Sequence, residues 1–217
     1  MGRNLEKDGI EMTAKRKLML DTGFRIMSEK GIEAVSMQEI ADACGLGIAT
    51  LYRYFNTKLA LVIAIGARKW LEYSEYAENK RIELFANGMT AAEEFGFYLD
   101  FYIDLYQNRK DLLRFNQSFN NYVQREGASA EQLRPYIDAI SGIAVFFHGI
   151  YEKGKRDGTI RTDQAEDKMF ASTSHIMLAV AVRYAGGLLF SAQREEDRTE
   201  EYQMLKRLLL KEYVIAC

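Results

Sequence analysis

The chain of 217 residues contains a single proline, Pro135. Proline makes up roughly 5% of the residues of an average protein. It removes a backbone hydrogen-bond donor and clashes with the preceding helical turn, so inside a helix it usually kinks or breaks the helix. A chain with almost no proline is able to form long uninterrupted helices, and we therefore expect an all-α fold.

Helical hydrophobic periodicity dominates the sequence, whereas the alternating pattern of β-strands is essentially absent. Capping residues and glycines divide the chain into about nine helices. We expect Thr13 to cap the first helix, Ser36 and Glu39 to form a capping box at the second, and Pro135 to begin the seventh. The expected helices cover residues 13–30, 36–44, 48–54, 58–84, 91–107, 110–125, 135–156, 163–190 and 197–215.

The residue composition argues against catalytic and metal-binding functions. The two cysteines, Cys44 and Cys217, provide neither a disulfide framework nor the spacing of metal ligands. The sequence has no glycine-rich phosphate loop and no HExxH motif, and we expect His148 and His175 to be ordinary helix residues. We therefore expect a protein that is not an enzyme and that holds no cofactor and no metal.

Charge and hydropathy point to a cytoplasmic protein. The N-terminal stretch MGRNLEKDGIEMTAKRK lacks the apolar centre of a signal peptide. No segment approaches the ~18 apolar residues that cross a bilayer, so we expect no membrane association. The net charge of -2 neither favours nor excludes a nucleic-acid partner, because DNA binding requires a local excess of cations rather than a basic chain.

The stretch GLGIATLYRYF, residues 45–55, contains no acidic residue, and it comprises the turn after one short expected helix and the whole of the next. Two helices of this length joined by a glycine-containing turn of three residues are typical of a helix-turn-helix. Gly45 is suited to the positive φ of a tight turn, and Ile40, Ala41 and Leu51 are spaced to converge under the helix crossing. The pattern predicts a DNA-binding helix-turn-helix whose second helix spans residues 48–54.

The side chains of this second helix suit the major groove of DNA. A recognition helix reads bases with its N-terminal residues, which here are Ile48, Ala49 and Thr50. Phosphates require donors: Tyr52 offers a hydroxyl, and Lys58 offers a charge at the start of the next helix. Arg53 and Lys58 are the only charged residues between positions 46 and 58, so the local attraction is weak and dimerisation would double it.

The segment SMQEIADACGLGIATLYRYFNTKLAL, residues 36–61, resembles the helix-turn-helix of the TetR family of bacterial repressors. The preceding segment GFRIMSEKGIEAVS resembles the first helix of that family and its glycine exit. The run Thr50-Leu-Tyr-x-x-Phe followed by Lys58 carries most of the specificity of this resemblance. Beyond these segments the chain is similar to the family only in length, helicity and the turn at residues 158–163.

The resemblance implies roles for eight residues. The base-contacting surface of the family corresponds to Gln38, Ile48, Ala49, Thr50 and Tyr54, and its phosphate contacts correspond to Ser36, Tyr52 and Lys58. The chain departs from the family pattern at Gly47, where a serine or threonine cap is usual, at Leu59, where an acid is usual, and at Gly23, where alanine is usual. The missing cap at Gly47 weakens the recognition helix by a few tenths of a kcal/mol.

The segment 91–125 is rich in aromatic residues that recur at helical spacing, with asparagines and a glutamine nearby. Ligand sites are mostly apolar with a few polar groups, so these residues are candidates for a small-molecule pocket. Ordinary core packing is the alternative for each of them. The candidate effector pocket comprises Tyr98, Phe101, Tyr102, Phe115, Phe119, Tyr122, Phe147 and His148.

The last two expected helices carry apolar residues at helical spacing and resemble the four-helix dimer interface of the family. A core within one chain is the alternative. A two-fold dimer would present two recognition helices about one DNA turn apart and would bind a palindromic operator. The candidate interface comprises Phe170, Met177, Val180, Ala181, Tyr184, Leu188, Leu205 and Leu209.

Together these features predict a DNA-binding domain over residues 1–58 and a larger helical domain for effector binding and dimerisation over residues 59–217. The resemblance implies a bacterial, homodimeric repressor that a small hydrophobic or aromatic effector releases from its operator. Two alternatives stay open. One is a helical enzyme or carrier that uses the aromatic pocket, and the other is a DNA-binding protein of this type that needs no effector.

Overall fold

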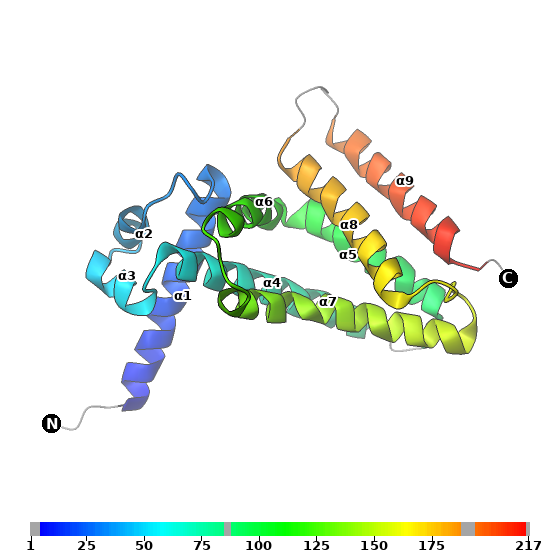
Figure 1. Ribbon diagram of the computed structural model, residues 1–217, viewed down its shortest axis with the longest axis horizontal. Coiled ribbons are helices and arrows are strands. Elements are labelled where there is room, and N and C mark those ends of the chain that lie inside the picture. Colours follow the sequence, from blue (N-terminus) through cyan, green and yellow to red (C-terminus); the bar gives the residue numbers. More distant parts are fainter. Residues whose placement is uncertain (1–4, 85–87, 188–193, 216–217) are drawn as a thin grey trace. The chain divides into compact units, whose positions relative to one another are not determined.

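The computed structural model describes residues 5–84, 88–187 and 194–215. In these ranges the chain forms nine α-helices and no β-strand, which confirms the predicted all-α class (Figure 1). One isolated antiparallel bridge joins Ile160 to Val214. The helices are α1 (Leu5–Lys30), α2 (Met37–Ala43), α3 (Ile48–Tyr54), α4 (Lys58–Leu84), α5 (Ala91–Asn108), α6 (Lys110–Arg125), α7 (Ala130–Asp157), α8 (Glu166–Ala185) and α9 (Glu195–Tyr213).

The first helix begins well before its predicted start. α1 already runs at Leu5, so Thr13 lies inside the helix and is not its cap. The segment upstream of Thr13 contains leucine, glutamate, lysine and methionine, which are strong helix formers and extend the helix. The prediction of a start at Thr13 was wrong because a residue suited to capping caps nothing when the chain before it is also helical.

The prediction that Pro135 begins the seventh helix was also wrong. α7 begins at Ala130, and Pro135 lies inside it. Ser129 and Gln132 form a reciprocal pair, in which Gln132 N donates to Ser129 Oγ at 3.2 Å and Ser129 N donates to Gln132 Oε1 at 2.9 Å. This capping box fixes the helix start, and its Ser-x-x-Gln spacing was a readable signal in the sequence.

The ends of the last two helices differ from the prediction by a few residues. α8 begins at Glu166 rather than at residue 163 and ends at Ala185, where Gly187 follows with a φ of 87°. Residues 188–190 of the predicted helix lie outside the described residues. α9 covers Glu195–Tyr213, and its C-terminal end pairs with the turn before α8 through Arg161 N and Tyr213 O at 2.7 Å.

The chain divides into two compact units. The first runs to Trp70 and includes Arg114–Ala139, and the second comprises Leu71–Leu113 together with the chain from Ile140 onward. α4 and α7 each contribute residues to both units. This structural division differs from a functional boundary after Lys58, which stays a prediction.

In the first unit, α2 packs against both α1 and α3. Ile40, Ala41 and Leu51 are fully buried, as the predicted convergence under the helix crossing requires. A Cβ at Gly23 of α1 would lie 2.8 Å from Ile65 Cδ1 of α4. This close approach accounts for glycine at a position where the family usually has alanine.

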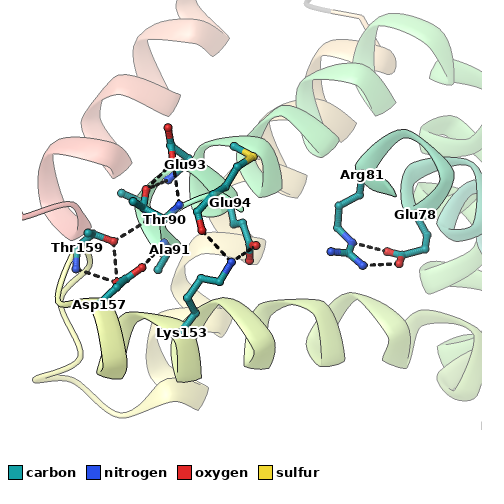
Figure 2. A network of polar contacts seen from close by, with 11 residues as sticks. Glu78, Arg81, Thr90, Ala91, Glu93, Glu94, Lys153, Asp157 and Thr159 are labelled. Carbon is teal, nitrogen blue, oxygen red and sulfur yellow. Dashed lines mark hydrogen bonds and ion pairs between the residues drawn. The ribbon is translucent and has the colours of Figure 1, made fainter. Parts of the chain in front are cut away.

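The core of the second unit is aromatic and centres on α5, which packs against α8 and α9. The ring of Phe95 lies 6.3 Å from that of Phe147 and 5.8 Å from that of Tyr213, measured between centroids. The start of α5 is held by side chains from its own first turn and from the end of α7 (Figure 2). There Ala91 N donates to Asp157 Oδ2 at 2.7 Å, and Thr90 and Glu93 form a capping box.

We expect Gly154→Ala to lower the free energy of unfolding by about 1–3 kcal/mol, the usual cost of overpacking a core. A Cβ at Gly154 would lie 2.3 Å from Cγ1 and 2.7 Å from Cδ1 of the buried Ile160, which forms the bridge to Val214. Urea denaturation followed by circular dichroism measures the change.

Gly149→Ala is the matched control on the same helix, because a Cβ there has no atom within 4 Å. This control should leave stability unchanged or raise it by up to ~1 kcal/mol through helix propensity. Equal stabilities of the two variants would contradict the packing described for the turn between α7 and α8.

Candidate DNA-binding surface and a cavity in the second unit

The turn between α2 and α3 is closed by backbone hydrogen bonds. Leu46 N donates to Ala41 O at 2.9 Å, and Gly45 N donates to Asp42 O at 3.0 Å, which is the Schellman arrangement. Gly45 has a φ of 65°, the left-handed conformation predicted for it. At the start of α2, Ser36 Oγ accepts from Glu39 N at 3.1 Å, so this half of the predicted capping box is present. The Glu39 carboxylate accepts a bond from Lys30 Nζ at 2.6 Å.

The recognition helix candidate, α3, is attached by one buried side chain. Leu51 is its buried residue, whereas Ala49 and Arg53 are exposed and Tyr52 is 46% exposed. Gly47 occupies the N-cap position and makes no side-chain hydrogen bond, as the sequence predicts. The helix therefore presents most of its surface outward while its first turn is held by backbone bonds alone.

A groove of about 570 Å³ in the first unit brings together five of the eight predicted DNA-contacting residues. They include all three of the predicted phosphate contacts, and the five are Ser36, Gln38, Ile48, Tyr52 and Lys58. The other three lie on α3, where Ala49 is exposed and Thr50 and Tyr54 are half-buried. The family resemblance implied this set of residues, and the fold brings most of them to one surface.

Two polar residues of this surface are already engaged. Gln38 Nε2 donates to Asp42 Oδ1 at 2.7 Å. Lys58 Nζ donates to Glu33 O at 3.3 Å and lies 5.4 Å from the centroid of the Tyr122 ring. Partial burial lowers the pKa of Lys58 from its ordinary value. Lys58 therefore sits at the edge of the groove with its charge held against α6, and it must extend to reach a phosphate.

Sequence reasoning missed the cations that α1 brings toward α3. The pKa of Lys15 is raised chiefly by its hydrogen bond to Glu11 and is lowered by Arg53, so Lys15 and Arg53 lie within electrostatic range of each other. The guanidinium of Arg16 lies 5.2 Å from the centroid of the Phe55 ring. These cations are far from the helix-turn-helix in sequence, and only the packing of α1 reveals that they are near it.

The second unit contains a cavity of about 790 Å³ between side chains of α4, α5 and α7. Tyr98 and Phe101 of the predicted pocket line it, together with Phe146, which was not predicted. Tyr102 and Phe147 are buried beside them: the hydroxyls of Tyr98 and Tyr102 lie 2.8 Å apart, and the rings of Tyr98 and Phe147 lie 5.3 Å apart. Half of the predicted pocket therefore lies at or just behind this cavity.

The structure does not bring the remaining predicted pocket residues to this cavity. Phe115, Phe119 and Tyr122 lie on α6 in the first unit, where Phe115 packs against Phe24 and Phe119 stacks on Tyr136 at 4.2 Å between centroids. Their helical spacing matched that of α5, but the two helices pack in different units, which periodicity alone does not distinguish.

His148 lies on the surface of α7, and both carboxylate oxygens of Glu166 lie 3.0–3.1 Å from its Nδ1. In the described part of the chain, His148, Glu152 and Glu166 form a group whose possible ligand atoms all lie within 4.8 Å of one another, which is close enough to hold a metal ion. All three side chains are partly exposed, and Lys155 Nζ already binds Glu152 at 2.7 Å. The arrangement is that of a hydrogen-bonded cluster on the surface.

Charged side chains border the cavity in two groups (Figure 2). Arg81 forms a two-pronged pair with Glu78, from Nε at 2.7 Å and from Nη2 at 2.6 Å. Glu94 accepts a bond from Lys153 Nζ, which also donates to Met89 O at 2.9 Å. The hydroxyl of Ser74 also lies at the cavity, buried and with no hydrogen-bond partner among the described residues.

The predicted dimer-interface residues divide by burial. Met177, Ala181 and Leu209 are buried within the second unit, and Leu188 lies outside the described residues. The four that are half-buried are Phe170, Val180, Tyr184 and Leu205. The large apolar side chains that α8 and α9 expose are Ile176, Met204 and Leu208, with exposed fractions of 41%, 50% and 55%. No helix within the described ranges has the length and apolar character needed to span a membrane.

Residues 19–65 match the family described as bacterial regulatory proteins, tetR family. The transcriptional repressor KstR of Rhodococcus jostii is 31% identical over 85 residues, which cover 36% of this chain and 40% of KstR. A transcriptional regulator of Staphylococcus aureus, SAB2452, is 25% identical over 180 residues, which cover 83% of this chain and 87% of that protein. The chain thus matches less than half the length of KstR but most of the staphylococcal regulator.

Solved structures share the fold at low identity. Bacillus subtilis FadR in complex with stearoyl-CoA has a TM-score of 0.69 and 16% identity, over 89% of this chain and 97% of FadR. A Saccharomonospora viridis protein in complex with choline has a TM-score of 0.70 and 17% identity, over 94% of this chain and 100% of that protein. The helix-turn-helix at residues 36–54 falls inside the matched segment, and the helical fold extends the likeness along the chain. The chain therefore belongs to the TetR family of bacterial regulatory proteins.

Proposed function

We propose that this protein is a homodimeric transcriptional repressor that binds a palindromic operator through α3 and leaves it when a small molecule occupies the cavity of the second unit. The observation that carries the proposal is the groove that gathers Ser36, Tyr52 and Lys58 beside the outward face of α3. It offers two hydroxyls and an ammonium where a recognition helix requires phosphate contacts on its flanks. Relatives of the chain are named transcriptional repressors, which supports repression rather than activation.

The exposed face of α3 suits the major groove. Ala49 and Thr50 are small, so the helix is able to approach base edges closely, and the methyl group of Thr50 suits contact with thymine. Ile48 adds a further apolar contact, and Tyr54 and Gln38 complete the base-contacting set. Lys58 exchanges its bond to Glu33 O for a phosphate oxygen, which is a stronger partner because it is charged.

Dimerisation is supported by apolar side chains exposed on α8 and α9. These two helices pack against each other (Figure 1). Ile176, Met204 and Leu208 would contact the partner subunit directly. Met177, Ala181 and Leu209, which sequence reasoning assigned to the interface, would support these residues from within the same chain. A two-fold dimer presents the same surface on both subunits and doubles the weak electrostatic attraction of each DNA-binding unit.

The cavity of the second unit is the proposed effector site. Its volume of about 790 Å³ falls within the range of small-molecule pockets, and aromatic rings line part of it. FadR of Bacillus subtilis has been solved with stearoyl-CoA and a Saccharomonospora viridis protein with choline, so proteins that share this fold bind small molecules. An effector would act by favouring a conformation that does not bind DNA.

We expect the double variant Tyr52→Phe, Lys58→Ala to weaken binding to every duplex alike, because phosphate contacts carry no sequence information. The slope of log K against log[salt] should become shallower by about two units for the dimer, since one cation is removed from each of its two DNA-binding units. Fluorescence anisotropy over a salt series measures this slope, with one duplex selected from genomic fragments by the wild-type protein and one of unrelated sequence.

Lys155→Ala is the control, because it removes one exposed cation from the second unit, outside the proposed surface. It should leave the salt slope unchanged, and circular dichroism checks the fold of both variants. If the double variant bound DNA with wild-type affinity, this result would contradict the assignment of Tyr52 and Lys58 as phosphate contacts.

We expect Leu208→Glu to convert the dimer into monomers, since it places a charge in the centre of the proposed apolar contact. Sedimentation equilibrium at micromolar concentration measures the mass. Leu71→Glu is the matched control: Leu71 is 50% exposed but lies on α4, outside the proposed interface. A wild-type monomer, or a variant that stays dimeric, would contradict the assignment of α8 and α9.

A further inference from the structure

The cavity of the second unit has an acidic side as well as an aromatic one. Among its lining residues in the described chain, three are carboxylates, Glu75, Glu78 and Glu94, and one is a cation, Arg81. Arg81 offsets one of these carboxylates, and Lys153, which pairs with Glu94, offsets another. One carboxylate charge is left over, so the site that a ligand enters has a negative formal charge. This balance disfavours an anionic ligand and favours a cationic one.

Arg81 occupies a position that is built for a cation. Its guanidinium lies 5.5 Å from the centroid of the Phe146 ring and is paired through two nitrogens with the Glu78 carboxylate. The pairing with Glu78 raises the pKa of Arg81, and the charge of Glu94 raises it further, so a second carboxylate acts at the same place. An aromatic face together with carboxylates is the usual receptor for an organic ammonium.

Arg81 is poorly placed to receive an anion. Two of its nitrogens and one face of its guanidinium are already occupied by Glu78 and Phe146. Lys153 is held by Glu94 and by Met89 O. A carboxylate or phosphate ligand would have to share the guanidinium with Glu78 and would lie in the field of Glu94 as well.

The rest of the cavity provides space for an apolar body. Phe101, Ile143 and Val145 line it, and the rings of Tyr98 and Phe146 lie 5.9 Å apart. The Ser74 hydroxyl is buried without a partner among the described residues, and such a group favours a ligand that carries a polar atom near it.

We propose that this cavity binds an amphipathic organic cation, with its ammonium against Phe146 in the place of the Arg81 guanidinium and its apolar part over Tyr98 and Phe101. The carboxylates of Glu78 and Glu94 face the bound cation. This proposal rests on the proposed effector site and adds the chemical class of the effector. Displacement of Arg81 couples occupancy of the cavity to α4, the helix that follows the helix-turn-helix.

The test compares three ten-carbon probes that differ in charge: decyltrimethylammonium, decanol and decanoate. Isothermal titration calorimetry with the full chain measures each affinity below the micelle concentration. The ammonium should bind at least ~10-fold more tightly than decanol, and decanoate should bind most weakly. Decanoate binding as tightly as the ammonium would overturn the proposal.

Two substitutions separate a cation site from an anion site. Arg81→Met removes the internal cation and keeps the apolar stem, so it should tighten ammonium binding, whereas an anion site would lose affinity. Phe146→Leu keeps an apolar side chain but removes the ring, so it should weaken ammonium binding roughly 5- to 30-fold and leave decanol binding nearly unchanged. Arg156→Met, an exposed arginine of α7, is the control for loss of positive charge.

Operator binding measured beside these titrations keeps the two proposals apart. Release of DNA by decanol or decanoate, but not by the ammonium, would leave the effector site standing and would overturn the cation assignment. Failure of all three probes to bind would overturn the assignment of this cavity, while salt-dependent operator binding would still support the DNA-binding function.

Discussion

The burial of Leu51 is the contact on which the DNA-binding surface depends. In α3, which the structure describes in full, it is the buried residue, and it packs where Ile40 and Ala41 of α2 are also fully buried. Because one side chain attaches the helix, the others are free to form an outward surface. Gly47 leaves the start of α3 without a side-chain cap, so the backbone bonds of the turn and Leu51 together determine where that surface points.

The aromatic residues of the second unit serve two purposes that sequence periodicity does not separate. Phe95 is fully buried and belongs to the core, whereas Phe146 is only partly buried and borders the cavity. Tyr98 does both, since it is fully buried, lines the cavity and bonds through its hydroxyl to Tyr102 and Ser174. Burial raises the pKa of Tyr98 well above its ordinary value, so the hydroxyl stays neutral and is able to donate. The wall of the cavity that Tyr98 forms is therefore held in place by the packing behind it.

Charge has a different role in each unit. On the DNA-binding surface the cations are few, and several are already paired or held within the chain, as Lys30 is with Glu39 and Lys58 with Glu33 O. A small number of available cations gives one unit a weak electrostatic attraction to DNA, which is the reason that the proposed function includes dimerisation. Around the cavity, by contrast, carboxylates outnumber cations. Arg81 pairs there with Glu78, and a cationic ligand would compete with Arg81 for the same carboxylate.

The sequence by itself determined the elements that local rules govern. The presence of a single proline and the apolar periodicity indicated an all-α chain. The bounds of α3, α4 and α6 agree with those predicted. The helix-turn-helix was also predictable, because it follows from capping, a glycine turn and helical spacing within a short segment, whereas its candidate DNA contacts, some of which rest on the family resemblance alone, stay a prediction. Errors arose where two local signals competed, as at the start of α7, where the Ser129 capping box and not Pro135 decides where the helix begins.

Tertiary structure alone decided which distant residues share a site. Phe101 and Phe119 have the same kind of helical spacing, yet one lines the cavity of the second unit and the other stacks on Tyr136 in the first. Arg81 and Phe146, which form the proposed cation site, are 65 positions apart in the chain and meet through the packing of α4 and α7. Periodicity states which side of a helix is apolar, but the partner of that side depends on the packing of the whole unit, and a single sequence does not encode it in any local pattern.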